Sequence, residues 1–175
     1  MVVDTILFGD CRETLKEFDG KARTCVTSPP YYGLRDYGGE ESQIGQEQTP
    51  EEYIQNLVEV FRSVRDVLTD DGTLWVNIGD SYYNYRPGKG QALPKQTVSK
   101  TKQDLPDKCA KRGNKLEGLK EKDLIGIPWM LAFALRADGW YLRQDIIWHK
   151  PNPMPESVKD RCTKSHEYLF LLSKN

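Results

Sequence analysis

The chain has 175 residues, of which 38% are hydrophobic and 29% charged, with a formal net charge of −1. This length and composition are typical of one folded globular domain. No apolar run approaches the roughly 18 residues that a membrane span needs, and the start MVVDTILFGD has no basic region or cleavage site. We therefore expect a single cytoplasmic domain over residues 1–175 with no membrane partner.

Short apolar runs along the chain predict five strands that are buried on both faces. Each run is rich in aliphatic, aromatic or β-branched residues: Thr5–Phe8, Arg23–Thr27, Thr73–Ile78, Leu142–Trp148 and Tyr168–Leu172. The four tryptophans are expected in the core or between helices and sheet: Trp75, Trp129, Trp140 and Trp148.

Two helices are predicted between these strands. Thr49 can cap the first, because Pro50 stands at its first position and Glu52 completes a capping box. Its apolar side chains then fall on one face: Ile54, Leu57, Val58, Phe61, Val64 and Leu68. Asp70, Asp71 and Gly72 end this helix, and the second runs from about Pro128 to Arg136 before Gly139.

Strands separated by helices predict an α/β fold, with right-handed crossovers, a mainly parallel sheet and helices on both faces. In such sheets, ligands bind beyond the carboxyl ends of the strands. Residues 84–122 interrupt the pattern with nine Lys and two Arg against two Asp and two Glu, a local charge of +7. Rich in Gly and Pro, this stretch is expected to be a flexible basic insertion, either simply solvated or closing on phosphates.

Cysteine spacing gives no support for a metal centre. Cys11, Cys25, Cys109 and Cys162 form no CxxC pair. Cys162 and His166 are the one combination that a metal could use, and we favour a reduced thiol and an ordinary histidine there. No metal site is expected.

The chemistry is expected where the second strand runs into Ser28, Pro29, Pro30 and Tyr31. Two prolines fix two φ angles and remove two N–H donors, so the turn is stiff and its carbonyls are free to accept hydrogen bonds. Ser28 Oγ and a main-chain carbonyl suit an exocyclic amino group, and a tyrosine ring can stack on the base. The structural alternative is a proline turn with a packing tyrosine.

The segment Thr27–Tyr37 resembles the target-base motif, (Asp/Asn/Ser)-Pro-Pro-(Tyr/Phe/Trp), of phage and bacterial DNA amino-methyltransferases. This family methylates cytosine N4 or adenine N6 with S-adenosylmethionine, and its members occur in restriction-modification. The resemblance implies a Rossmann-like S-adenosylmethionine-dependent methyltransferase fold. It implies base-handling roles for Ser28, Pro29, Pro30 and Tyr31, and DNA as the partner.

Other segments resemble the family in its order. Phe8–Cys11 is similar to the element whose acidic residue, here Asp10, reaches the adenine end of the cofactor, and Gly72–Ser81 is similar to the next core strand, with Asp80 a further cofactor candidate. The segments Asp145–Pro155 and His166–Phe170 are similar to the region that closes over the flipped base. Within the first of these, Lys150 and Asn152 are expected to meet DNA.

In the permuted branch of the family, this catalytic motif comes first and the Phe-x-Gly-x-Gly cofactor loop comes later. The nearest match here, Gly88-Lys89-Gly90, follows no predicted strand. We therefore expect the fold to be incomplete at the methionine end of the cofactor site, as a fragment, a natural truncation or one half of a split enzyme whose partner is the missing C-terminal half.

The resemblance implies base flipping and direct methyl transfer, with acceptors at Ser28 and the Pro29 or Pro30 carbonyl stabilising the developing charge. The serine form of the motif favours cytosine N4 over adenine N6. A catalytically inactive DNA-binding or partner-binding fragment is the alternative. Methylation of RNA or of a protein glutamine is less favoured, because Leu34–Tyr37 matches the DNA enzymes better.

Overall fold

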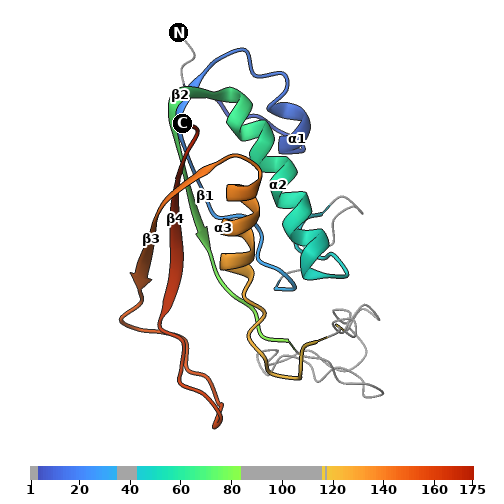
Figure 1. Cartoon of the computed structure of the whole chain (residues 1–175), viewed down its shortest axis with the longest axis vertical. Coiled ribbons are helices and arrows are strands. Elements are labelled where there is room, and N and C mark those ends of the chain that lie inside the picture. The colour runs from blue at the N-terminus through green and yellow to red at the C-terminus, as the bar shows by residue number, and fades with distance from the viewer. Residues whose placement is uncertain (1–3, 35–42, 84–115, 117) are drawn as a thin grey trace, which may run out of the picture.

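A computed structural model describes residues 4–34, 43–83, 116 and 118–175 (Figure 1). In chain order, the elements are α1 (Cys11–Thr14), β1 (Ala22–Thr27), α2 (Pro50–Val67), β2 (Leu68–Ile78), α3 (Ile127–Ala137), β3 (Tyr141–His149) and β4 (His166–Ser173). Most of the expected insertion 84–122, the motif's continuation at 35–37 and the Gly88–Gly90 match lie outside the described residues.

The four strands form one sheet in the order β1-β2-β4-β3. β1 and β2 are parallel, whereas β4 is antiparallel to both β2 and β3. Three strands therefore run the same way and β4 is reversed between two of them. The sheet is mixed, with one parallel and two antiparallel pairs, rather than mainly parallel as predicted. The reversal follows from the link 150–165, which contains no helix and so cannot provide the crossover that parallel neighbours need.

Helix α2 begins as predicted. Thr49 Oγ1 accepts from the backbone N–H of Glu52, and Glu52 Oε2 accepts from the backbone N–H of Thr49, so both halves of the capping box are present. The predicted apolar stripe is buried from Ile54 to Leu68. It packs on alternate residues of the sheet and on α3, and this cluster forms the core.

Helices α2 and α3 lie side by side on the same face of the sheet (Figure 1). The face that holds Leu74, Val76, Ile78 and Phe170 is buried beneath them. No helix of the described part covers the opposite face, so the prediction of helices on both faces was wrong for these residues. Trp148, expected in packing, is 53% exposed because its register with Glu167 places it on that uncovered face.

The predicted strand Thr5–Phe8 was also wrong. These residues take no strand conformation, and Ile6 and Phe8 are 76% and 86% exposed. Apolar composition suggested a strand, but these residues pair with none of the four described strands. The edge strand β1 also has an unpaired side, because β2 is its only partner in the described part, and Val26 on β1 is 73% exposed.

The described residues that flank the stretch 84–115 are joined to each other. Tyr83 N donates to Asp123 O at 2.8 Å, Lys122 N donates to Tyr83 O at 2.7 Å, and Ile125 N donates to Ser81 O at 3.0 Å. The chain therefore leaves and re-enters the domain at one place, as an insertion does. None of the described helices is long and apolar enough to cross a membrane.

Helix α3 starts at Gly126, whose φ of 89° suits glycine, and it has no cap from its own N-terminal residue. Asp80, two residues beyond β2, supplies the cap instead. Its Oδ1 accepts from the backbone N–H groups of Gly126 at 2.9 Å and Ile127 at 3.0 Å, and from Ser81 N at 2.9 Å. One carboxylate oxygen thus joins the end of β2 to the start of α3.

We predict that Asp80→Ala lowers the free energy of unfolding by about 1–2 kcal/mol, because it removes a charged acceptor from the first N–H groups of α3. Urea denaturation of the 175-residue chain measures the effect. Asp19→Ala, at an exposed position outside any helix or strand, is the matched control and should leave stability unchanged. Equal stability of the two variants would contradict the capping role.

Candidate active site

The loop that follows β1 is tied to three other segments. Tyr53 Oη, on α2, donates to the Pro30 carbonyl at 2.8 Å. Ser81 Oγ, just after β2, donates to the Tyr32 carbonyl at 2.9 Å, and Gly33 N donates to Gly45 O at 2.8 Å. Prolines already stiffen this loop, and these bonds hold it at the carboxyl end of the sheet.

The bond from Tyr53 distinguishes the two proline carbonyls. Pro30 O is occupied by a buried tyrosine hydroxyl, and burial first of all raises the pKa of Tyr53, which keeps that hydroxyl a donor. Among the described residues, no hydrogen bond reaches the Pro29 carbonyl. Of the two acceptors considered from the sequence, Pro29 O is therefore the one without a partner in the described part, although Pro29 itself is buried and Pro30 is exposed.

Tyr31 lies against the end of β2. A Cβ at Gly79 would come within 2.7 Å of Tyr31 Cε2, so glycine is needed there for the ring to lie on the backbone. Tyr31 Oη is 3.1 Å from both Asn77 Oδ1 and Glu167 Oε2. Burial raises the pKa of Tyr31, and the charge of Glu167 adds to this rise against an opposing hydrogen bond with Ser28.

Ser28 is held only loosely. Its Oγ is 3.5 Å from Asn77 Oδ1, at the outer limit for a hydrogen bond, and the residue is exposed. The hydroxyl can therefore turn to an incoming partner. All four predicted motif residues thus lie together on one loop, with the tyrosine fixed and the serine available.

Glu167 and Asn77 also lie at this loop; the sequence analysis included them only within the segments His166–Phe170 and Gly72–Ser81 and gave neither an individual role. Glu167 opens β4 and forms an ion pair with Lys150, which follows β3. Partial burial raises the pKa of Glu167, but hydrogen bonds from Lys150 and Tyr31 outweigh it and the net pKa is lowered. Lys150, predicted to meet DNA, is therefore engaged with this carboxylate, whereas Asn152 makes no side-chain hydrogen bond or ion pair with any residue that the structure describes.

Asp10 lies at the start of α1, and its carboxylate takes hydrogen bonds from Arg12 Nε at 3.0 Å and Arg12 Nη2 at 2.5 Å. These bonds lower the pKa of Asp10. Arg12 N also donates to Oδ1 and Arg12 Nε to Oδ2, so both oxygens of Asp10 already accept from Arg12, and a further donor such as an adenosine hydroxyl would have to share them; the side chain is 35% exposed. Asp80, in contrast, has one oxygen committed to the cap of α3.

Groups that could bind a metal do not gather in the described part. Residues 4–34, 43–83, 116 and 118–175 hold no cluster of three or more His, Cys, Asp or Glu side chains suited to a metal ion. Cys11, Cys25 and Cys162 are free thiols, and burial raises the pKa of Cys25. Cys109 lies outside the described residues.

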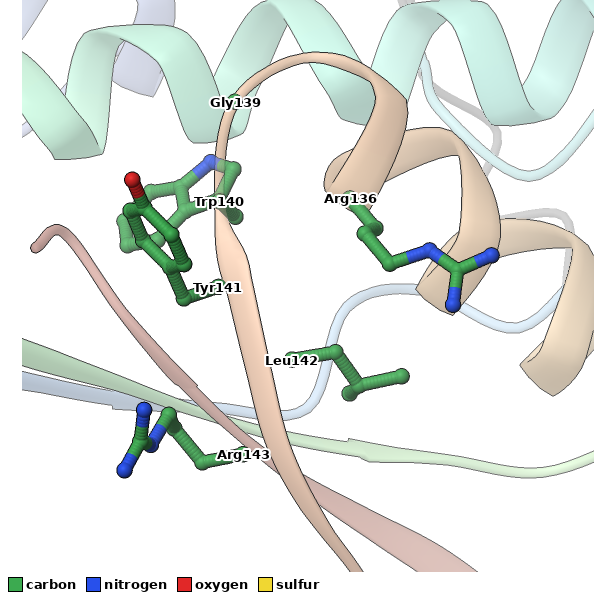
Figure 2. Close-up of a pocket in the computed structure, with 6 residues that line it drawn as sticks. All are labelled: Arg136, Gly139, Trp140, Tyr141, Leu142 and Arg143. Atoms are coloured by element: carbon green, nitrogen blue, oxygen red, sulfur yellow. The ribbon is translucent and has the colours of Figure 1, made fainter.

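A shallow cavity lies between the end of α3 and the start of β3 (Figure 2), lined by Arg136, Gly139, Trp140, Tyr141, Leu142 and Arg143. Because Tyr141 pairs with Ser173, which pairs with Thr73, this cavity is at the opposite end of the sheet from the motif. Figure 2 shows the two arginine side chains pointing away from each other, so they do not converge on one ligand.

Comparison with known proteins identifies the group to which the chain belongs. A family model for DNA methylases of the N6/N4 methyltransferase type matches residues 22–175. The Type II methyltransferase M.SmaI of Serratia marcescens is 54% identical over 175 residues, covering 97% of this chain and 55% of the relative. M.Cfr9I of Citrobacter freundii is 53% identical over 172 residues, covering 98% and 54%. The chain thus spans about half the length of these relatives.

Solved structures of low identity share the fold. A protein of Thermus thermophilus assigned as a DNA modification methylase, solved with S-adenosylmethionine, has a TM-score of 0.58 at 21% identity, covering 95% of this chain and 51% of its own. The cytosine-N4-specific PvuII DNA methyltransferase has a TM-score of 0.59 at 18% identity, covering 95% and 48%. These likenesses confirm the Rossmann-like methyltransferase fold. Since the family model matches residues 22–175, the chain belongs to the N6/N4 DNA methylase family.

Proposed function

We propose that this chain forms the base-handling part of a DNA methyltransferase that moves a methyl group from S-adenosylmethionine to the exocyclic amino group of a flipped base. The observation that carries the proposal is the loop Ser28–Tyr31. It is braced at the carboxyl end of the sheet, yet Ser28 is exposed and the buried Pro29 has a carbonyl that no described residue hydrogen-bonds.

The two free acceptors match the two N–H bonds of an amino group. A base inside a duplex cannot present this group, so it must leave the stack. In the proposed complex, Tyr31 stacks on the base while Ser28 Oγ and Pro29 O accept from the amino nitrogen. Acceptors at this point stabilise the positive charge that develops on nitrogen, and no covalent bond to a cysteine is needed.

S-adenosylmethionine, when bound, would supply the methyl group on its positively charged sulfur. Asp10 is our candidate for its adenosine end, because its carboxylate remains exposed and ionised beside Arg12. Asp80 is the weaker candidate, since its Oδ1 already serves three backbone N–H groups.

The base is proposed to be cytosine, modified at N4, with adenine N6 as the second candidate. Serine at the first motif position offers a short neutral acceptor, and this form resembles the cytosine-N4 members more often. The test is mass spectrometry of DNA nucleosides after reaction with the complete product of the gene. We expect N4-methylcytosine; N6-methyladenine alone would reject the cytosine assignment and leave the motif argument intact.

We predict that Ser28→Ala and Tyr31→Ala impair methyl transfer in different ways. The serine variant should lower kcat by about 10- to 100-fold, because an acceptor to the reacting nitrogen is lost. The tyrosine variant should lose roughly 1–3 kcal/mol of stacking and bind the target duplex more weakly. Steady-state kinetics of the complete gene product measures both.

Matched controls exist for both substitutions. Ser63→Ala lies on the exposed side of α2, and Tyr141→Ala lies at the far end of β3, where the ring is 57% exposed. Both should retain full activity. If the motif variants behaved like these controls, the loop would not be the site of reaction.

We also predict that the 175-residue chain alone binds S-adenosylmethionine weakly or not at all and shows no turnover. The relatives carry almost as much again of polypeptide that has no counterpart here, and the outer edge of β1 has no partner among the described residues. Isothermal titration calorimetry of the chain provides the measurement. A micromolar Kd would show that these residues already form the whole cofactor site.

The alternative function is a DNA-binding or partner-binding domain without catalysis. The same kinetic assay on the complete gene product distinguishes this alternative from a methyltransferase. Saturating S-adenosylmethionine without any methylated nucleoside, together with retained DNA binding, would favour this alternative over the enzyme.

A further inference from the structure

A hydrogen-bonded network crosses the end of the sheet and takes residues from the ends of all four strands. Tyr31 follows β1, Asn77 lies in β2, Glu167 opens β4 and Lys150 follows β3. Lys150 pairs with one oxygen of Glu167, and the other oxygen lies 3.1 Å from Tyr31 Oη. Tyr31 Oη lies at the same distance from Asn77 Oδ1.

The orientation of the Asn77 amide is fixed by its other partner. Asn77 Nδ2 donates to the carbonyl of Tyr168 at 3.2 Å, and a carbonyl can only accept. The oxygen Oδ1 therefore points toward Ser28 and Tyr31. Since Glu167 and Asn77 Oδ1 both offer lone pairs, the Tyr31 hydroxyl must be the donor, and its single proton is shared between two acceptors.

The pairing with Lys150 keeps Glu167 charged. A carboxylate accepts a hydrogen bond more strongly than a neutral group does. The Glu167 side chain is 20% exposed, so the charge is partly shielded from water, and Lys150 offsets the cost of that burial. Its charge therefore makes Glu167 a stronger acceptor for Tyr31 than the neutral Asn77 amide.

We propose that Glu167, held by Lys150 and aided by Asn77, is a positioning residue that sets the Tyr31 ring where it can stack on the target base. The proposal rests on the function proposed above and adds to it a determinant outside the Ser28–Tyr31 motif. One side of the Tyr31 ring lies against the backbone at Gly79, and its hydroxyl is held by Glu167 and Asn77. These contacts together fix the orientation of the ring.

The competing role for Glu167 is a direct contact with the base. Its carboxylate lies beside the same tyrosine and could itself accept from an amino group. The two roles differ in one respect: a positioning residue acts only through the Tyr31 hydroxyl, whereas a base-contacting residue acts without it.

A double-mutant cycle with Glu167→Leu and Tyr31→Phe separates the two roles. Both variants remove the hydrogen bond between Tyr31 and Glu167, and Tyr31→Phe also removes the one to Asn77, so each should lower kcat of the complete gene product by about 3- to 10-fold. The double variant should be no slower than the slower single variant, because groups that act as a unit are not additive. Multiplied losses in the double variant would overturn the proposal.

Two further variants serve as rescue and control. Glu167→Gln keeps an oxygen acceptor and should recover most of the kcat lost in Glu167→Leu. Glu59→Leu makes the same glutamate-to-leucine change on the exposed side of α2 and should keep full kcat. Failure of the glutamine variant to exceed the leucine variant would count against an acceptor role.

A readout without catalysis makes the test independent of the proposed function. In the 175-residue chain labelled with ¹³Cζ-tyrosine, Glu167→Leu should shift the Tyr31 resonance and leave the exposed Tyr141 unchanged. An unmoved Tyr31 resonance would overturn the positioning role, whatever the enzyme assay gives. If the resonance moves but the wild-type gene product methylates no DNA, the function proposed above fails while the contact to Tyr31 stands.

Discussion

The parallel register of β1 and β2 is the constraint on which the site depends. Thr27 pairs with Val76, so both strands end at the same edge and the two following segments lie next to each other. Ser28 and Tyr31 are thereby placed beside Asn77 and Gly79. A shift of one residue in this register would turn Asn77 to the opposite face and remove it from the tyrosine.

The core extends this constraint to the loop itself. The capping box starts α2 at Pro50, and the apolar stripe then sets the rotation of the helix against the sheet. That rotation directs Tyr53 to the Pro30 carbonyl. The cap, a local signal in the sequence, therefore contributes through helix packing to the rigidity of a proline turn earlier in the chain. The same packing leaves Pro29 O, rather than Pro30 O, without a partner among the described residues.

What could be predicted from the sequence was mostly local. The stripe from Ile54 to Val64 and the break at Gly139 follow from periodicity and backbone preference, and both are confirmed. Leu68 is buried but opens β2, and Asp70, Asp71 and Gly72, predicted to end the helix, lie inside that strand. The motif Ser28–Tyr31 was found through its resemblance to a family. Thr5–Phe8 was predicted wrongly because apolar composition does not tell whether a segment has a strand to pair with.

The remaining site residues depend on contacts that the sequence does not reveal. Tyr31 and Glu167 are 136 positions apart and meet only because β4 is reversed beside β2, a reversal not contained in the hydrophobic pattern. Asp80 was read as a cofactor candidate from its place after a strand, and its bonds to the start of α3 could not be foreseen. The contact between Tyr31 and Glu167 and the cap at Asp80 both depend on how distant segments pack together, rather than on residue type.

The central claim is that the base lies on Tyr31. Photocrosslinking tests it most directly: a duplex with a photoreactive halogenated base at the mapped methylation position is irradiated with the complete gene product, and the crosslinked peptide is sequenced. We predict a crosslink to Tyr31, lost in Tyr31→Ala. A crosslink confined to another aromatic, such as the exposed Trp148, would contradict the account.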